Sequence, residues 1–374
     1  MSWPAEAVRV RVPATSANLG PGFDALGLAL TLYDDLEVRA AARGLAIEVT
    51  GEGAQTAGAG EDHLIVRAMR AAFETIGGQP PGLSLRCTNR IPHGRGLGSS
   101  AAAIVAGVVA ARALAGPHGP AAADGPRVLS DDAVFALAAG IEGHRDNVAA
   151  CLAGGLTIAW ATTGQRGQPG QPRLARLSPR PEIVPVACIA ADALPTQEAR
   201  QALPRAVRHA DAAANAGRSA LLVAALTSDP ALLLDATRDW LHQPYRAAAM
   251  PATADLVGRL REAGIPAATS GAGPSVLALL AGEYFPGLDV LGSIVSETGN
   301  AWHISPLNVD RHGASVQLGP LDATSGTAAH QAWAGYGLGR VRPGSAAPQE
   351  AQDRSSASAT HGQLSREYRG LSWC

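Results

Sequence analysis

Alternation of apolar and polar residues at the start of the chain predicts a β-strand. In Val8–Val12, valine and arginine take turns, which is the pattern of a strand with one buried face. Pro13 is expected to end this strand, and a loop of small polar residues over 14–22 is expected to follow. The same kind of pattern predicts three more strands, at Leu36–Val38, Leu45–Val49 and Leu83–Cys87.

The spacing of apolar residues predicts three helices in the rest of the first half of the chain. Leu64–Ile76 has this spacing and is followed by Gly77 and Gly78, a typical helix stop. A second helix, rich in alanine and valine, is expected to begin near Ser99 and to end at Gly116. Asp131–Glu142 predicts a third helix, with Ser130 as its N-cap.

The later part of the chain alternates predicted strands and helices. Proline and glycine are frequent over 164–173, so we place a boundary there between two lobes, 1–163 and 164–319. From about residue 320 the chain loses its periodicity, and 320–374 is expected to be a disordered tail. The alternation predicts an α+β or α/β architecture. The expected strands are Gly155–Trp160, Ile183–Ala190, Ser275–Leu280, Trp302–Ile304 and Ala314–Val316, and the expected helices are Ser219–Leu226, Ala231–Leu241 and Ala254–Ala263.

Composition narrows the classes of protein to consider. The chain has 374 residues, 47% of them apolar, and a net charge of −2, which argues against broad binding to nucleic acid or to an anionic membrane. No signal peptide is apparent, and no apolar segment reaches the ~20 residues of a membrane span, so a cytoplasmic protein is expected. The four cysteines form no CxxC pair. All thirty basic residues are arginine, so no site here can use a lysine.

The segment from Pro92 to Ala102 carries the strongest chemical signal. Gly94, Gly96 and Gly98 lie between a predicted strand and a predicted helix, whose N-terminus would attract an anion such as a polyphosphate. A tight turn with close helix packing explains the glycine spacing about equally well. The spacing is not G-x-G-x-x-G, and the missing lysine excludes a Walker loop.

Three segments in order along the chain resemble the motifs of the GHMP kinases, the family of galactokinase, homoserine kinase, mevalonate kinase and phosphomevalonate kinase. They are Pro13–Asp24, the glycine-rich segment, and Thr269–Ser275. The resemblance covers about residues 8–318. It implies an α+β fold with an N-terminal lobe like the second domain of ribosomal protein S5 and a C-terminal ferredoxin-like lobe. It also implies that ATP is bound by Pro92, His93, Gly94, Arg95, Gly96, Leu97, Gly98, Ser99, Ser100, Ala101 and Ala102.

A magnesium site is expected beside this loop. Mg²⁺ keeps several waters, so one carboxylate, one hydroxyl and phosphate oxygens are enough to hold it. Glu142 matches the magnesium-binding glutamate of the family, and Ser100 is the matching hydroxyl, with Ser99 as its alternative. Taken alone, Glu142 would be read as an ordinary surface carboxylate.

The segment Glu142–Ala149 reads E-G-H-R-D-N-V-A and resembles the E-G-H-P-D-N-V-A-P of the homoserine-kinase branch. A polar turn between a helix and a strand would explain the same residues. Arg145 and Ala150 stand where that branch has proline, which puts the rigidity of the loop in doubt more than its chemistry.

An amino-acid acceptor needs partners for its carboxylate and its ammonium group, and arginine is the natural carboxylate clamp. Thr196 and Arg200 would share one face of a helix. The segments around Arg200 and Arg246 resemble those that carry the carboxylate-binding arginines of the homoserine branch. The same resemblance implies that the acceptor is bound by Asn18, Asp24, His144, Asn147, Thr196, Arg200 and Arg246.

The resemblance implies transfer of phosphate from ATP to the side-chain hydroxyl of L-homoserine, on the route to threonine. Asn147 is expected to hold the hydroxyl, Asp146 is the nearest candidate base, and Arg200 is grouped with them as catalytic. A kinase acting on mevalonate or a shikimate-like alcohol is the alternative, and a non-catalytic ligand sensor is a third. Family precedent implies a homodimer.

Overall fold

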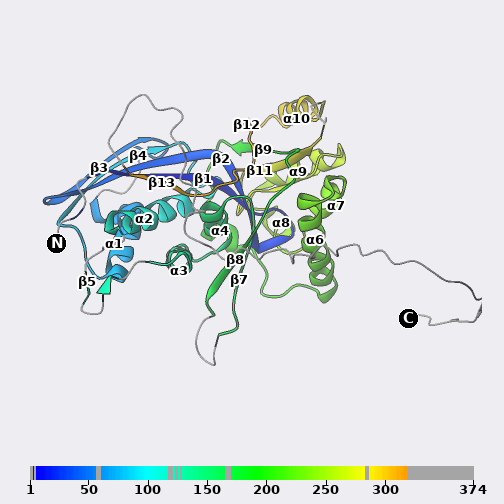
Figure 1. Cartoon of the computed structure of the whole chain (residues 1–374). Coiled ribbons are helices and arrows are strands. Elements are labelled where there is room, and N and C mark those ends of the chain that lie inside the picture. Colours follow the sequence, from blue (N-terminus) through cyan, green and yellow to red (C-terminus); the bar gives the residue numbers. More distant parts are fainter. Residues whose placement is uncertain are drawn as a thin grey trace, which may run out of the picture. The chain divides into compact units, whose positions relative to one another are not determined.

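Two main β-sheets, both covered by helices, organise the chain in this computed structural model (Figure 1). The structure describes residue 3 and residues 6–55, 60–116, 121–122, 125–126, 129–164, 170–282 and 286–318. The first sheet has the order β13-β1-β2-β4-β3, with β7 paired to β2 and β8 to β7. Its strands are β1 (Val8–Asn18), β2 (Gly22–Ala41), β3 (Gly44–Gly51), β4 (Gly82–Asn89), β7 (Leu156–Ala161), β8 (Pro172–Leu177) and β13 (Ser315–Leu318).

The second sheet has the order β10-β11-β9-β12, and all its neighbouring strands are antiparallel. Taken along the chain, these strands and two of the intervening helices form a β-α-β-β-α-β unit, which is the ferredoxin-like arrangement. The strands are β9 (Ile183–Ala190), β10 (Ala267–Thr269), β11 (Val276–Ala281) and β12 (Trp302–Pro306). A separate two-stranded pair joins β5 (Ala121–Ala122) and β6 (Gly125–Pro126).

Four helices lie against the first sheet on the side shown below it in Figure 1. They are α1 (Leu64–Ile76), α2 (Ser99–Ala115), α3 (Asp131–Glu142) and α4 (Asp146–Ala153). The bounds predicted for α1 and α3 are confirmed, and the Ser130 hydroxyl caps α3 by accepting a hydrogen bond from Ala133 N. α2 is apolar on nearly every face because it lies in the core between β1, α1 and α3.

The helices of the second half include two that pack together, α9 (Pro251–Glu262) and α10 (Pro286–Glu297). α9 covers β10 and β11, and its Leu256 and Leu260 share a core with Val186 and Val276. The remaining helices are α5 (Thr196–Gln201), α6 (His209–Thr227), α7 (Leu233–Ala236) and α8 (Gln243–Arg246), with single 3₁₀ turns η1 (Gly60–Asp62) and η2 (Pro230–Leu232). No helix in the described ranges is long and apolar enough to cross a membrane.

The expectation that Pro13 ends the first strand is wrong. β1 continues to Asn18, and a register shift between Pro13 and Ala14 bends the strand. Such a bulge accommodates a residue that has no N–H to donate to the ladder. The segment 14–18, expected to be a loop, is therefore part of the first sheet.

The helix expected over Ala231–Leu241 is also wrong beyond Ala236. η2 and α7 give way to a loop in which the Asp239 carboxylate accepts hydrogen bonds from the backbone N–H groups of Leu241, His242 and Gln243. These N–H groups are therefore not available to a continuing helix, and α8 begins in its place. α4 and α10 are two helices that the sequence patterns did not predict.

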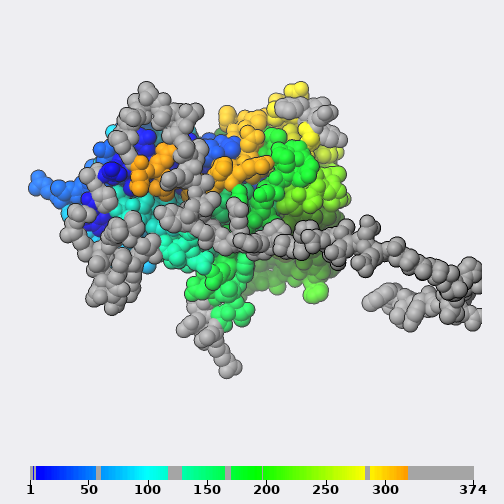
Figure 2. Space-filling model, viewed as in Figure 1, coloured from blue at the N-terminus to red at the C-terminus, as the bar shows by residue number. Residues whose placement is uncertain are grey.

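The α+β class and the two-lobed fold are confirmed. β8 lies after residue 163, in the expected second lobe, and pairs with β7 of the first sheet. β13 returns to the first sheet and pairs with β1, which Figure 2 shows as orange residues beside blue ones. The described residues belong to one compact unit, Met1–Leu338. The expected tail, 320–374, lies outside the described residues, and the domain limits stay a prediction.

Candidate functional site

The glycine-rich loop before α2 takes a backbone path that requires glycine. Gly94, Gly96 and Gly98 have φ angles of 67°, 74° and 73°, in the left-handed region. A Cβ at Gly96 would collide with the carbonyl oxygen of Ser270, and one at Gly98 with the Thr15 hydroxyl. The glycines therefore permit close packing of the loop against segments from both ends of the chain.

Hydrogen bonds join the three motif segments into one structure. Thr15 N donates to Leu97 O (3.0 Å), and the Ser270 hydroxyl donates to Gly96 O (2.7 Å). Gly271 N donates to the carbonyl oxygen of Ala17 at 3.1 Å, which joins the third motif segment to the first. The motifs are far apart in sequence, so each loop is held in place by the other two.

The N-terminus of α2 opens from this loop as an anion site. The first helical hydrogen bond runs from Ala102 N to Gly98 O, so the N–H groups of Ser99, Ser100 and Ala101 have no acceptor within the helix. Three other residues expected to bind ATP, Leu97, Ala101 and Ala102, have buried side chains that pack in the core.

Arg95 also binds protein groups. Its guanidinium donates to the backbone oxygens of Ala190 (2.9 Å) and Ala191 (2.7 Å), at the end of β9, and to His93 O. A direct phosphate contact from this side chain would cost these bonds. Its place in the structure is a link between the loop and the second sheet.

A cavity of about 280 Å³ lies beside the loop, and the sequence motifs did not predict it. The side chain of His63 is 6% exposed there, and its Nδ1 has no hydrogen-bond partner. No short motif marks this cavity, because its walls come from β1, β2, β4, the start of α1 and α2. The lining residues are Val12, Asp34, Asp35, Leu36, His63, Leu64, Ile65, Asn89, His93, Ser99, Ser100, Ala102, Ala103 and Ala106.

A second cavity, of about 530 Å³, shares Ser100 with the first. It brings together Glu142 and His144 from the first lobe with Gln197, Arg200 and Gln201 from α5. Burial and the nearby Arg200 charge lower the pKa of His144, which favours its neutral form. Gln197 and Gln201 were not predicted; they lie four residues apart and share one face of α5.

Ser100 and Glu142 lie together as expected for a metal site. The Ser100 hydroxyl donates to Glu142 Oε2 at 2.7 Å. Burial, with the nearby Asp146 carboxylate adding to it, raises the pKa of Glu142, and a cation beside it would offset both effects. Among the described residues, no group of three or more metal-ligating side chains occurs. One carboxylate and one hydroxyl fit Mg²⁺ that takes its other ligands from phosphates and water.

The first turn of α4 places Asp146 and Asn147 next to this site. Asp146 is 3% exposed, and one oxygen of its carboxylate accepts a hydrogen bond from Asn147 N (2.8 Å). Burial raises the pKa of Asp146 to about 6. The Asn147 side-chain oxygen accepts from the Thr15 hydroxyl at 2.8 Å, which orients the amide. In the described part of the chain its NH₂ group makes no hydrogen bond and remains free to donate.

We expect Asp146→Asn to stabilise the folded chain at pH 7.5 by about 1–3 kcal/mol while impairing its activity. The folded pKa of Asp146, about 6, lies above its unfolded value, so the buried carboxylate costs stability once it is ionised. That cost is absent at low pH and grows as pH rises through 4 to 6. The gain from asparagine should therefore shrink as pH falls from 6 toward 4. Urea unfolding at pH 7.5 and 5 measures it.

The exposed Asp289 provides the control, since Asp289→Asn should change stability little at either pH. An Asp146→Asn chain that is less stable than the native one at pH 7.5 would contradict this account of the buried carboxylate.

Asp24 and Arg200 form an ion pair between the two halves of the chain. Arg200 Nη2 lies 2.5 Å from Asp24 Oδ1, and Nη1 lies 3.3 Å from Oδ2. Asn18 supports the pair, because its side chain accepts from Asp24 N (2.9 Å) and donates to Gly271 O (2.8 Å). Asn18 and Asp24 both have φ angles above 50°, in the left-handed region. The hydrogen bond between these two residues stabilises this backbone conformation. A contact between Asn18 and an acceptor stays a prediction.

Arg246 lies in the same region but is buried, with 2% exposure. Burial lowers its pKa to about 10, and the neighbouring Arg200 charge adds to the shift. The guanidinium carbons of Arg200 and Arg246 lie 5.7 and 5.6 Å from the centre of the Phe23 ring. Of Thr196, the structure describes only its place as the first residue of α5.

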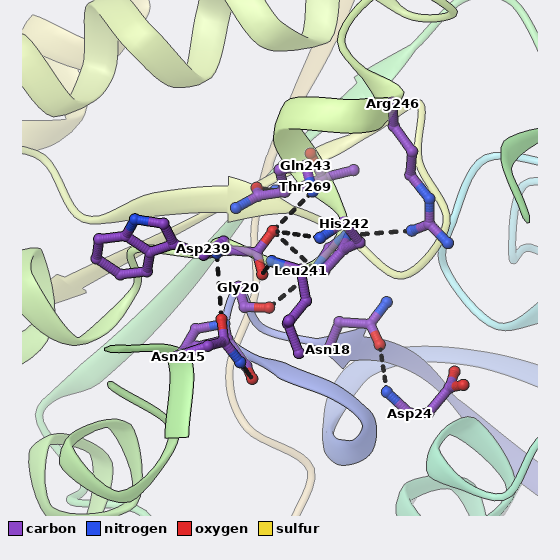
Figure 3. A network of polar contacts seen from close by, with 12 residues as sticks. Asn18, Gly20, Asp24, Asn215, Asp239, Leu241, His242, Gln243, Arg246 and Thr269 are labelled. Atoms are coloured by element: carbon purple, nitrogen blue, oxygen red, sulfur yellow. Dashed lines mark hydrogen bonds and ion pairs between the residues drawn. The ribbon is translucent and has the colours of Figure 1, made fainter. Parts of the chain in front are cut away.

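A polar network behind Arg246 was missed by the sequence patterns (Figure 3). Its centre is Asp239, whose side chain is fully buried and caps the loop before α8. His242 contacts Arg246 from this loop, and Gln243 accepts a hydrogen bond from Thr269 N at 2.7 Å. An aspartate shortly before Pro244 is a helix-start signal that could have suggested the cap. The sequence near His242 could not have suggested that its Nε2 contacts Gly20 O, 222 positions earlier in the chain.

Comparisons with known proteins agree with these motifs. Residues 63–155 match the model of the GHMP kinases N terminal domain, and residues 221–283 match that of the GHMP kinases C terminal domain. The homoserine kinase of Streptomyces coelicolor is 54% identical over 323 residues, covering 86% of this chain and 98% of that protein. The homoserine kinase of Clavibacter michiganensis is 47% identical over 312 residues, 83% of this chain and 94% of that protein. The crystal structure of homoserine kinase from Cytophaga hutchinsonii superposes with a TM-score of 0.70 at 25% identity, covering 85% of this chain and 99% of that one.

Proposed function

This chain belongs to the GHMP kinase family, and from that premise we propose that it transfers the γ-phosphoryl group of ATP to the side-chain hydroxyl of L-homoserine. The product is O-phospho-L-homoserine, an intermediate of threonine biosynthesis. The extent and identity of the match to homoserine kinases support this reaction. The two cavities that meet at Ser100 supply neighbouring places for donor and acceptor.

The donor would occupy the glycine-rich loop and the smaller cavity. Free N–H groups at the start of α2 and the positive end of that helix suit the phosphates of ATP. Ser100 and Glu142 would hold Mg²⁺, which neutralises phosphate charge when bound. Their position at the junction of the two cavities supports this assignment.

The observation that carries the choice of acceptor is the ion pair between Asp24 and Arg200. Homoserine has one carboxylate and one ammonium group, which can exchange partners with this pair. The ammonium group would bind Asp24, while the carboxylate would bind Arg200 and Arg246. One zwitterion thereby replaces one half-exposed ion pair and supplies a partner of opposite charge to each of its two groups. Mevalonate lacks the ammonium group and would leave Asp24 without a partner.

The hydroxyl of homoserine would accept a hydrogen bond from the free NH₂ group of Asn147, whose oxygen is fixed by Thr15. The hydroxyl oxygen attacks the γ-phosphorus, the bond from that phosphorus to the β-phosphate bridging oxygen breaks, and ADP leaves. Positioning of this kind can supply ~7–11 kcal/mol of barrier lowering, so a strong base is not required. Asp146, with a pKa of about 6, is ionised at neutral pH and lies beside Asn147, where it can accept the hydroxyl proton.

ADP release in a coupled assay tests the proposal with four reactions: L-homoserine, mevalonate, shikimate, and no acceptor. We expect Mg²⁺-dependent ADP release with L-homoserine and only background rates in the other three. Faster turnover of mevalonate or shikimate would make the chain a GHMP kinase of different specificity. Binding of L-homoserine by calorimetry without ADP release would make it a sensor. The paired Ser100 and Glu142 argue against a sensor, which needs no metal site.

Homodimer formation and a place in the cytosol are further parts of this proposal. The homodimer rests on family precedent and the location on the absence of an apparent signal peptide or membrane span in the sequence; size-exclusion chromatography with light scattering tests the first.

A further inference from the structure

His242 contacts Phe23 and Arg246 and lines neither of the two cavities described above. Its side chain is completely buried, and its ring stacks on Phe23 with centroids 5.2 Å apart and an angle of 27° between planes. The guanidinium groups of Arg200 and Arg246 also contact the Phe23 ring. A buried imidazole in this position needs a partner for both ring nitrogens.

The partners of His242 fix its tautomer. Nε2 lies 2.8 Å from Gly20 O, and a carbonyl oxygen can only accept, so Nε2 carries the proton. Nδ1 lies 3.1 Å from Arg246 Nη1, and a guanidinium can only donate, so Nδ1 is the acceptor. The ring is therefore neutral, and burial lowers its pKa in agreement with this.

The guanidinium of Arg246 is held through two of its three nitrogens. Nε donates to Ala199 O at 3.0 Å, and Nη1 faces His242 and, at 3.4 Å, Gly271 O. Within the described ranges, Nη2 makes no hydrogen bond, so its two N–H groups remain available to a carboxylate. The contact with His242 thus decides which nitrogen of the fork is used internally.

The position of His242 is itself fixed by several elements (Figure 3). Asp239 Oδ2 accepts from His242 N (3.0 Å) and from Gln243 N (2.6 Å). Asn215 of α6 accepts from Trp240 N (3.2 Å) and donates to Pro21 O (2.8 Å). The loop that carries His242 is therefore joined to α6 and to the turn before β2, the strand that carries Asp24.

We propose that His242 is a positioning residue for the acceptor site, holding Arg246 through Nη1 so that Nη2 is directed at the carboxylate of the amino-acid acceptor. This inference rests on the proposed function and deepens it. Its consequence is specific: His242 controls recognition of the carboxylate, and has no part in binding ATP or in the transfer step.

Two substitutions that keep a polar side chain separate this role from a merely structural one. The amide of asparagine reaches about as far as Nδ1, and that of glutamine about as far as Nε2. His242→Asn therefore retains an acceptor for Arg246, whereas His242→Gln retains only a donor for Gly20. We expect His242→Gln to raise KM for L-homoserine about ten- to a hundredfold, the range for a lost hydrogen bond to a charged group, with kcat and KM for ATP within twofold of the native chain. His242→Asn should remain within about threefold in all three constants.

An acceptor without a carboxylate provides a second readout. 3-Aminopropan-1-ol has the hydroxyl and amine of homoserine but no carboxylate, so native and His242→Gln chains should use it with equal kcat/KM. In a chain that already carries Arg246→Gln, His242→Gln should have no further effect. His303→Gln, at an exposed position of β12, is the matched control and should behave as the native chain.

The inference is overturned if His242→Gln leaves KM for L-homoserine unchanged, if kcat falls instead, or if 3-aminopropan-1-ol is used less well in parallel. Equal defects in the asparagine and glutamine variants would overturn it too. Should His242→Gln fail to fold, Arg246→Gln alone is expected to raise KM for L-homoserine and to leave the use of 3-aminopropan-1-ol unchanged, and an unchanged KM for L-homoserine would overturn the inference. A native chain that does not phosphorylate L-homoserine at all would refute the proposed function instead, before any variant is compared.

Discussion

Glu142→Gln is expected to lower kcat/KM about a hundred- to a thousandfold and to weaken the response of the rate to Mg²⁺. Glutamine keeps an oxygen that can accept the hydrogen bond from Ser100, so the local structure should survive. What is lost is the negative charge of a carboxylate that lines the second cavity and contacts Ser100, the residue shared by both cavities. Titration of the initial rate with MgCl₂, together with the dissociation constant of Mg·ADP, measures the effect.

Glu297→Gln, at the end of α10, removes an exposed carboxylate and serves as the control. If Glu142→Gln retained the rate within fivefold and the same Mg²⁺ dependence, Glu142 would not be a metal ligand. Because burial raises the pKa of Glu142, its protonated form should begin to weaken metal binding at a higher pH than an exposed glutamate would.

Arg200→Gln and Arg246→Gln together are expected to reduce kcat/KM for L-homoserine by about a thousandfold or more, mainly through KM, because both carboxylate partners are lost. Each single substitution should cost about ten- to a hundredfold. Arg200→Gln also leaves the Asp24 carboxylate without its bidentate partner, so its effect should include some loss of stability. Steady-state kinetics with varied L-homoserine, and thermal unfolding of each variant, measure the two parts.

3-Aminopropan-1-ol again separates recognition from chemistry, since it should lose little when the arginines are replaced. Arg86→Gln, on the outer face of β4, changes an exposed arginine in a surface ion pair and should leave the kinetics as they are. A double variant with unchanged KM for L-homoserine would exclude the amino-acid acceptor while leaving the kinase assignment intact.

Local signals in the sequence predicted the elements that depend on nearby residues. The bounds of α1 and α3 followed from apolar spacing, a serine cap and glycine stops. The full length of β1 could not be predicted in this way, because pairing with β2 and a bulge after Pro13 allow the strand to continue past the proline. The helix expected over 231–241 failed for a similar reason, since the Asp239 side chain takes the backbone N–H groups that a helix would use.

The candidate site shows the same difference between local and distant signals. Short motifs predicted a phosphate-binding loop and a metal pair at Ser100 and Glu142, and the structure places these two side chains in contact. The ion pair between Asp24 and Arg200 was not predicted, because the resemblance implied only that each of them contacts the acceptor. The smaller cavity could not be predicted, because its walls come from five separated segments. His242 was hidden for a related reason: its contact with Gly20 spans 222 positions, and nothing near it in the sequence indicates that contact.

The hydrogen-bonded union of the three motif loops also has a consequence for synthesis of the chain. Asn18 binds Gly271, which lies 253 residues later. At about 5–20 residues per second, a ribosome needs roughly 13–50 s to travel from the first partner to the second. During that interval the glycine-rich loop has been made, but Ser270 and Gly271, which hold it, do not yet exist. The glycine-rich loop therefore cannot take up its native contacts until most of the chain has been made, and a chain that terminates before the third motif is expected to be inactive.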